Sequence, residues 1–133
     1  MFTKRKSIKQ IEEGKDLAPK FDKTGLIPVI TTDYKNGNVL MHGYMNRQAL
    51  KKTIETGEVY YWSRSRKTIW HKGATSGFIQ KVKEIRIDDD QDAIWVKVST
   101  IASCHVGYKS CFYRSIPIKK NKIKMIFKEK KKT

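Results

Sequence analysis

The feature that most constrains the fold is a series of short β-rich segments separated by turn signals. Asn36-Gly37 is the strongest of these signals, because this dipeptide favours the tight turn that joins two antiparallel strands. The predicted strands cover residues 26–32, 39–44, 59–62, 67–71, 78–82, 84–87, 93–101 and 112–118. Many short strands without an internal repeat predict a sheet that is mainly antiparallel.

One central helix is predicted over residues 47–56. Asn46 is a favourable N-cap, and Gly57 stands where a left-handed glycine often ends a helix. Residues 1–20 are predicted to form a short helical arm. The fold class is therefore α+β, mainly antiparallel β with one central helix, in a single domain of residues 1–116 followed by a lysine-rich tail, 117–133. Because a small sheet often completes its core with a second copy, we expect a homodimer.

The net charge of +16 restricts the partners that suit this chain. Residues 117–133 carry eight lysines and one glutamate, so +7 lies on the tail and +9 on the other 116 residues. A basic surface suits nucleic acid, and it equally steers a phosphorylated anionic substrate. No apolar run approaches the roughly 20 residues that span a bilayer, and the N-terminus lacks the apolar core of a secretory signal. A cytoplasmic location is expected.

Four aspartates gather within residues 88–92, and clustered carboxylates repel one another unless a cation neutralises them. In an extended segment alternate side chains share a face, so Asp88, Asp90 and Asp92 are predicted to point one way. Asp89 would then point the other way. Carboxylate oxygens are the ligands that Mg²⁺ prefers. The segment predicts a magnesium site from Asp88, Asp90 and Asp92, with an inert acidic turn as the alternative.

The chain has two cysteines, Cys104 and Cys111, and in a reducing cytosol such thiols more often bind metal or catalyse than form a disulfide. Their spacing is wider than that of a CxxC knuckle, so two buried thiols without a metal are the alternative. The polar loop between them and the adjacent His105 favour a metal. Two cysteines do not complete a tetrahedron, so a third ligand and a water would make an open, catalytic zinc site.

These residues lie within a longer pattern that resembles the phosphoribosyl-AMP cyclohydrolases, the third-step enzymes of histidine biosynthesis. The most specific parts are the WSRSR run at 62–66 and the ending CH-x5-CF at 104–112. Further matching segments are 25–29, 39–41, 44–46, 56–58, 70–73, 75–77 and Gln80. Together they cover roughly residues 25–115, and we expect no fused pyrophosphohydrolase domain.

The resemblance implies a homodimer with active sites between subunits, a zinc ion held by three cysteines from both chains, and magnesium on the aspartate cluster. Carried over, Cys104 and Cys111 are zinc ligands, and Asp88, Asp90 and Asp92 are magnesium ligands. The family's third cysteine usually lies within the aspartate cluster, where this chain has Asp89. A carboxylate oxygen also binds zinc, and Cys₂Asp carries the ligand charge of Cys₃, so we expect activity to be retained.

Two further positions depart from the family pattern. Ala74 stands where glutamate is common, and Phe78 stands where histidine is common. Both departures concern details of the binding cavity rather than the reaction.

The implied reaction is hydrolytic opening of the adenine ring of phosphoribosyl-AMP at its N1–C6 bond by a zinc-activated water. His105 is the candidate proton carrier, because an imidazole both accepts and releases a proton near neutral pH; His71 is a weaker candidate. The two phosphates of the substrate are assigned to a set of polar residues, with a solvated basic surface as the alternative. This set is Arg64, Arg66, Lys72 and Ser76, of which the two arginines are predicted to share a strand face.

Two other interpretations stay open at this stage. One is a basic nucleic-acid-binding module with a structural zinc, and the other is an inactive cyclohydrolase homologue in which Asp89 no longer binds zinc. Salt-dependent binding without turnover would indicate the first, and low zinc content would indicate the second.

Overall fold

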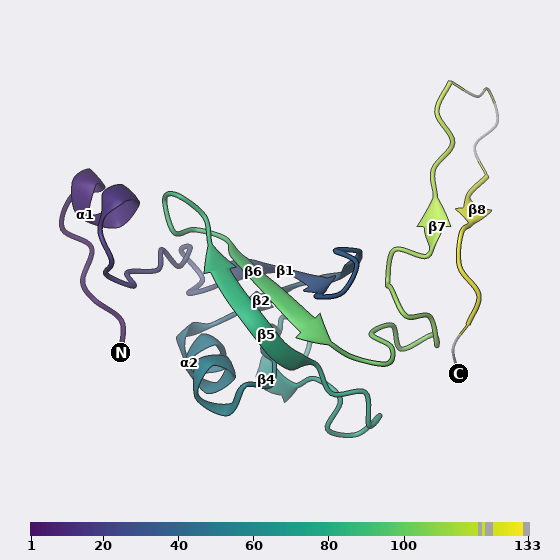
Figure 1. Cartoon of the computed structure of the whole chain (residues 1–133), viewed down its shortest axis with the longest axis horizontal. Coiled ribbons are helices and arrows are strands. Elements are labelled where there is room, and N and C mark those ends of the chain that lie inside the picture. The colour runs from purple at the N-terminus through teal and green to yellow at the C-terminus, as the bar shows by residue number, and fades with distance from the viewer. Residues whose placement is uncertain (120, 122–123, 132–133) are drawn as a thin grey trace.

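The computed structural model describes residues 1–119, 121 and 124–131. Within this part of the chain two helices and eight strands follow one another along an elongated molecule, with α1 at one end and the β7–β8 hairpin at the other (Figure 1). Their order is α1 (Ile8–Glu13), β1 (Ile27–Asp33), β2 (Val39–Met45), α2 (Arg47–Thr56), β3 (Tyr60–Ser63), β4 (Thr68–His71), β5 (Lys81–Ile87), β6 (Ile94–Ser99), β7 (Arg114–Ser115) and β8 (Ile126–Phe127). The predicted α+β class is confirmed.

The central sheet has the strand order β2-β1-β6-β5. The β1–β2 and β5–β6 pairs are antiparallel, as predicted, but β6 lies parallel to β1, with Val29 opposite Ile94. A parallel pair needs a long crossover, and here the chain between the two strands contains α2 and the β3–β4 hairpin. The two ends of β6 lead into loops that lie at opposite ends of the strand: residues 88–93 before it and the loop from residue 100 after it.

Helix α2 begins and ends where the sequence predicts. The Asn46 side chain accepts a hydrogen bond from the Ala49 N–H at 2.8 Å, and Gly57 adopts the left-handed conformation with φ 73°. Its apolar face packs on the sheet. The buried core includes Ile27, Val29, Leu40, Met45, Ala49, Leu50, Val59, Tyr61, Ile94, Val96 and Val98. This core fixes the strands whose ends carry the polar loops.

Several predicted boundaries are wrong. The N-terminal arm, predicted to be helical within residues 1–20, is helical only over Ile8–Glu13, where Ser7 and Gln10 form a capping box. The predicted strands at 78–82 and 84–87 join into β5 through an irregularity between Val82 and Glu84. The strand expected at 112–118 shrinks to Arg114–Ser115, which pairs with β8.

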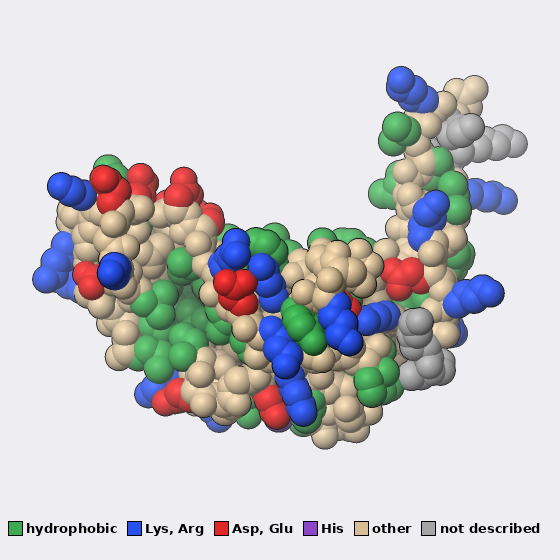
Figure 2. All heavy atoms as spheres, viewed as in Figure 1, with side chains coloured by type: hydrophobic (Ala, Val, Ile, Leu, Met, Phe, Trp, Pro, Cys, Tyr) green, Lys and Arg blue, Asp and Glu red, His purple; other side chains and the backbone are tan. Residues whose placement is uncertain are grey.

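Part of the lysine-rich tail is thus a strand, while its residues 120, 122–123 and 132–133 lie outside the described chain. Figure 2 shows acidic side chains gathered at the α1 end of the molecule and basic side chains along the β7–β8 hairpin at the other end. Neither described helix is long or apolar enough to span a bilayer. The charge is therefore unevenly distributed along the long axis.

Candidate active site

A cavity of about 630 Å³ lies beside the loop that follows β6. Five residues predicted from the sequence line it: Arg66, Lys72, Ser76, Cys104 and His105. They come from the β3–β4 turn, the loop after β4 and the loop after β6, so three separate segments converge here. A volume of this size accommodates a small ligand, and the lining combines cations, hydroxyls, an imidazole and a thiol.

Residues 103–111, the cysteine loop, form a compact turn rather than an open coil. The Ser103 N–H donates to the Lys109 carbonyl at 2.9 Å, and the Cys104 N–H donates to the Tyr108 carbonyl at 3.0 Å. The Cys111 N–H donates to the Leu40 carbonyl of β2 at 2.7 Å, which holds the far end of the loop against the sheet. The two cysteine side chains meet as a result.

The contact between the cysteine sulfurs affects the protonation of Cys111. Partial desolvation, the Cys104 thiol and a hydrogen bond with it raise the pKa of Cys111 to about 11, while the nearby Lys72 ammonium opposes this rise. Two adjacent thiols form half of a soft tetrahedral donor set, which suits zinc, and they must lose their protons to bind it. These two thiols could hold zinc together, and Cys104 lines the cavity.

Lys72 is almost fully buried, with 6% of its surface exposed, and its ammonium donates to the Ser103 carbonyl. Burial lowers its pKa, and the neighbouring thiols of Cys111 and Cys104 act in the opposite direction. Its Nζ also lies 5.0 Å from the centre of the Trp70 ring. Lys72 is therefore placed to stabilise negative charge at the cysteine pair as well as on a ligand in the cavity.

A chain of buried polar groups runs from the core to the cysteine loop, and no sequence pattern had assigned it a role. The Tyr61 hydroxyl lies 2.6 Å from Thr31 Oγ1 and donates to the Gln80 amide oxygen, also at 2.6 Å. The Gln80 amide nitrogen donates to Ser103 Oγ at 3.0 Å. Gln80 is fully buried. Because an unpaired buried amide is costly, this network fixes the residue that precedes Cys104.

The two arginines of the WSRSR run separate. β3 ends at Ser63, so Arg64 and Arg66 lie in the turn before β4, and the prediction that they share a strand face is wrong. Arg66 lines the main cavity, whereas Arg64 lies in a neighbouring cavity with its guanidinium 4.1 Å from the centre of the Tyr44 ring. Because the turn directs the two arginine side chains into different cavities, the pair suits two separated anionic groups better than a single one.

The three histidines differ in their surroundings. His105 is exposed and lines the main cavity next to Cys104. His71 bonds Glu58 Oε1 through Nε2 at 2.8 Å and stacks on Tyr60 with ring centres 4.4 Å apart, so its side chain is already engaged. His42 lies beside Tyr44 in the neighbouring cavity. This geometry favours His105 as the imidazole that meets a ligand in the main cavity.

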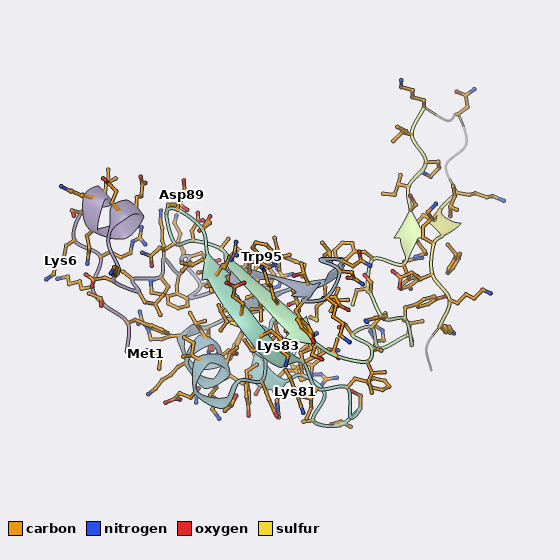
Figure 3. The ribbon with its side chains drawn as sticks, viewed as in Figure 1. Met1, Lys6, Lys81, Lys83, Asp89 and Trp95 are labelled. Carbon is orange, nitrogen blue, oxygen red and sulfur yellow. The ribbon has the colours of Figure 1, made fainter. Side chains whose placement is uncertain are left out.

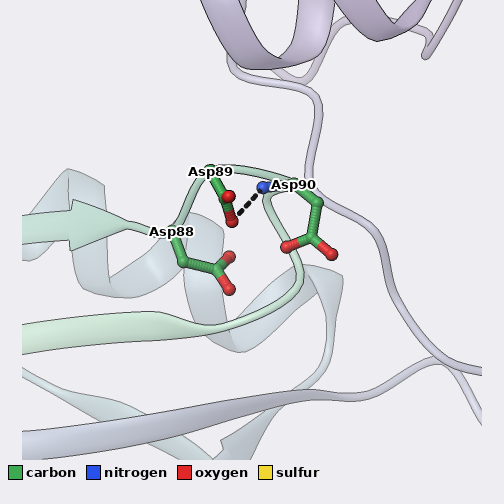
Figure 4. Close-up of side chains that lie close together, drawn as sticks. All are labelled: Asp88, Asp89 and Asp90. Atoms are coloured by element: carbon green, nitrogen blue, oxygen red, sulfur yellow. Dashed lines mark hydrogen bonds between the residues drawn. The ribbon is translucent and has the colours of Figure 1, made fainter.

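Residues 88–92, the aspartate turn, connect β5 and β6. The Asp92 and Ala93 N–H groups donate to Asp88 Oδ1 at 2.9 and 3.1 Å, and the Asp90 N–H donates to Asp89 Oδ1 at 2.9 Å. Ligand atoms of Asp88, Asp89 and Asp90 lie within 4.8 Å of one another (Figure 4). The predicted extended geometry, with Asp89 facing away, is wrong because the segment turns back on itself.

The crowded carboxylates of this turn share protons unevenly. Asp88 and Asp90 raise the pKa of Asp92 to about 6. Burial would raise the pKa of Asp88 as well, but its hydrogen bonds with Asp92 and with the backbone keep it below the ordinary value. Crowded carboxylates repel one another, a divalent cation would relieve that repulsion, and hard oxygen ligands suit Mg²⁺.

Gln91 anchors the aspartate turn and was also missed. It is buried, has φ 59°, and accepts a hydrogen bond from the Ala18 N–H at 2.8 Å. Its amide nitrogen donates to the carbonyls of Ile11 and Asp16 at 2.9 and 3.1 Å. The one signal in the sequence was a glutamine within an otherwise acidic run. Its strained left-handed backbone is held in place by these side-chain hydrogen bonds.

The aspartate turn and the cysteine loop lie at opposite ends of β6. Six residues in extended conformation span about 20 Å, so Asp89 and Cys104 of one chain do not share a metal. Figure 3 places Asp89 at the α1 end of the sheet, whereas β6 runs from there toward the opposite end. Within a single chain the predicted set of Asp89, Cys104 and Cys111 is not brought together.

Comparison of the sequence with known proteins identifies the family to which this chain belongs. The family model described as phosphoribosyl-AMP cyclohydrolase matches residues 41–113, which contain the cavity, the aspartate turn and the cysteine loop. The chain belongs to the phosphoribosyl-AMP cyclohydrolase family, which is a family of enzymes.

Individual relatives extend the match beyond this segment. The phosphoribosyl-AMP cyclohydrolase of Rhodopseudomonas palustris is 58% identical over 108 residues, covering 80% of this chain and 72% of the relative. The enzyme of the same name from Bradyrhizobium diazoefficiens is 50% identical over 119 residues, covering 89% and 85%. That of Nitrobacter winogradskyi is 51% identical over 112 residues, covering 84% and 77%. The resemblance noted in the sequence is confirmed over most of the chain.

Proposed function

We propose that this protein hydrolyses phosphoribosyl-AMP, opening its adenine ring at the N1–C6 bond in the third step of histidine biosynthesis. The observation that carries the proposal is the convergence of Arg66, Lys72, Ser76, Cys104 and His105 on one cavity in a chain of this family. Recognition of a bisphosphorylated nucleotide calls for separated cations, and Arg64 and Arg66 point into two neighbouring cavities.

The metals are part of the proposal. The adjacent thiols of Cys104 and Cys111 suit zinc, and the carboxylates of Asp88, Asp90 and Asp92 suit magnesium. The chemistry that zinc supplies when bound is a water of lowered pKa, available as a nucleophile at neutral pH.

The chain's own groups supply the remaining steps. His105 accepts the proton of the attacking water and delivers it to the adenine nitrogen that leaves, a role suited to an imidazole on the cavity wall. Arg66 and Ser76 bind one phosphate, and Arg64 binds the other. Lys72 holds negative charge at the cysteine pair in a site where burial strengthens electrostatic interactions.

Asp89 completes the zinc site from a second copy of the chain in this proposal. One copy offers two thiols at one end of β6 and a carboxylate at the other, too far away to join them. A two-fold dimer brings the aspartate turn of each chain to the cysteine loop of the other, which gives two complete sites. Asp89 is exposed to solvent, although its carboxylate lies with those of Asp88 and Asp90, so a second chain has access to it.

Turnover of phosphoribosyl-AMP by the purified full chain tests the activity. We expect turnover that zinc chelation abolishes and added zinc restores, with magnesium present throughout. Absence of turnover with both metals supplied, in protein shown to be folded by its thermal melting, would overturn the proposal and leave an inactive family member.

Mixing two inactive variants tests the shared site. Asp89→Asn and Cys104→Ser chains each form homodimers without an intact zinc site. After subunit exchange, a mixed dimer contains one site with both cysteines and Asp89 intact, so activity should return. No recovery, although mass spectrometry shows mixed dimers, would mean that each chain builds its site alone.

A further inference from the structure

The C-terminal hairpin contacts the cysteine loop, although both of its strands lie beyond the segment that the family model matches. β7 and β8 pair antiparallel, with Arg114 opposite Phe127, and the Lys128 N–H donates to the Tyr113 carbonyl at 2.9 Å. The hairpin projects from the body of the molecule (Figure 1). A two-stranded hairpin alone is only marginally stable in water, so its base needs support.

That support is an aromatic cluster shared with the cysteine loop. The Tyr108 and Tyr113 rings stack with centres 3.8 Å apart and planes 6° from parallel. The Phe127 ring lies 6.3 Å from the Tyr108 ring and 6.0 Å from the Tyr113 ring. The two contacts of Phe127 lie within the range of about 4.5–7 Å at which aromatic pairs attract one another beyond the area that they bury. Tyr108, the member that belongs to the cysteine loop, is 8% exposed.

Tyr108 connects this cluster directly to Cys104. Its carbonyl accepts the hydrogen bond from the Cys104 N–H, and its position between the two cysteines makes it part of the only covalent path that joins them. Glu129 adds a longer contact, since its carboxylate accepts from the Ser110 N–H at 3.4 Å. A ring held in place at Tyr108 therefore restricts the backbone that orients the Cys104 thiol.

We propose that the C-terminal hairpin is a brace for the cysteine loop, and that Phe127 is a positioning residue that keeps the two thiols arranged for metal binding. The identity of the metal rests on the proposed function, whereas the brace itself concerns only contacts within this chain. Stabilisation is reciprocal: the loop supports the base of the hairpin, and the hairpin restricts the loop.

The test compares full-length Phe127→Ala with Ile126→Ala. Ile126 precedes Phe127 in β8, is similarly exposed at 51% against 62%, and is absent from the aromatic cluster. Zinc affinity is measured by chelator competition, and magnesium affinity at the aspartate turn serves as an internal reference. Two readouts need no metal: amide hydrogen exchange at Cys104, and the rate at which Cys104 and Cys111 are alkylated.

We expect Phe127→Ala to weaken zinc binding about tenfold, as the loss of groups that orient metal ligands commonly does. Exchange at the Cys104 amide and thiol alkylation should both accelerate, while magnesium affinity stays unchanged. Ile126→Ala should match the unmodified chain, and Phe127→Trp should restore most of the effect because it returns an aromatic ring.

Equal behaviour of Phe127→Ala and Ile126→Ala in exchange, alkylation and zinc affinity would overturn the proposal. So would a loss that Phe127→Trp fails to repair. Because exchange and alkylation are measured without metal or substrate, these outcomes are separate from the failure of the proposed reaction.

Discussion

The two ends of β6 carry sites that are built in opposite ways. At one end the cysteine loop is held by distant segments: β2 through Cys111, the β5 side of the sheet through Gln80, and the C-terminal hairpin through Tyr108. At the other end the aspartate turn is shaped mainly by hydrogen bonds among its own residues. Local bonds suffice for a site whose carboxylates face water, whereas thiols in a cavity wall need a supporting shell.

A buried glutamine stands behind each site, and this similarity sharpens the contrast. Gln80 joins the core to the residue before Cys104, and Gln91 joins the aspartate turn to the N-terminal arm. Each amide uses both its oxygen and its nitrogen. The two glutamines differ in their partners: Gln80 bonds residues of the core and of the cysteine loop, whereas Gln91 bonds the N-terminal arm.

Removing a cysteine should have the largest effect. Cys104→Ser is expected to abolish zinc binding and to lower turnover by at least ~10³-fold, since a catalytic metal supplies several kcal/mol. Magnesium affinity at the aspartate turn should not change. Zinc content and magnesium titration on the same preparation check both statements, and Val106→Ala, an exposed change in the same loop, serves as control.

Replacing each of the two glutamines singly by alanine should affect one site and leave the metal affinity of the other unchanged. Gln80→Ala removes a buried partner from the hydroxyls of Tyr61 and Ser103, of which Tyr61 keeps its contact with Thr31. Gln91→Ala removes the side-chain partner of backbone groups in the N-terminal arm. Each should cost about 1–3 kcal/mol of unfolding free energy. Zinc affinity should fall only in Gln80→Ala and magnesium affinity only in Gln91→Ala. Losses of both metals in both variants would contradict independent sites.

Changing Asp89 tests the departure from the family pattern. Asp89→Cys restores three thiolates and should bind zinc about tenfold more tightly, a change of about 1.4 kcal/mol, because soft thiolate ligands favour zinc. Asp89→Asn should weaken zinc binding through the loss of a charged ligand. Chelator competition measures both. Unchanged zinc affinity in both variants would remove Asp89 from the zinc site.

The smallest effect concerns Asp92 in the metal-free protein. Its pKa is about 6 in the folded chain, above its ordinary value of 3.8, so the folded state holds that proton more tightly than the unfolded chain. Stability therefore falls as pH rises from about 4 to about 6. Asp92→Asn should remove this loss and raise Tm by about 1–4 °C at pH 8, but not at pH 4.

Thermal melting at both pH values measures the difference. Glu55→Gln, an exposed change on α2 outside the cluster, should show no such pH dependence. Added magnesium should remove the advantage of Asp92→Asn, because the cation relieves the same repulsion. An equal shift at both pH values would contradict the mechanism.

Local signals predicted local structure well. Asn46 and Gly57 define α2 to the residue, and Asn36-Gly37 marks the β1–β2 turn. The sequence also identified five residues of the main cavity, because the WSRSR and CH-x5-CF patterns are specific. What it missed depends on contacts distant in the chain. The parallel pairing of β6 with β1 and the roles of Gln80 and Gln91 leave no periodic trace.

The aspartate run shows why a residue pattern alone misplaces side chains. Alternation applies only to extended backbone, and the left-handed Gln91 ends that regularity within the run. The N-terminal helix carried a usable signal in Ser7 and Gln10, whose spacing is that of a capping box. The stack of Tyr108, Tyr113 and Phe127 could not be predicted, because the positions of these three aromatic residues in the sequence follow neither helical nor strand periodicity.

The central place of β6 also has a consequence for folding. β6 lies between β1 and β5, and its pairing of Ile94 with Val29 joins residues 65 positions apart. Such distant pairing forms slowly, because a long loop must close before any contact compensates the lost entropy. The aspartate turn precedes β6 and the cysteine loop follows it, so neither is held in its final place until this strand is inserted. The metal binding that we propose would then wait for a complete sheet, and partly synthesised chains would not trap ions in unfinished sites.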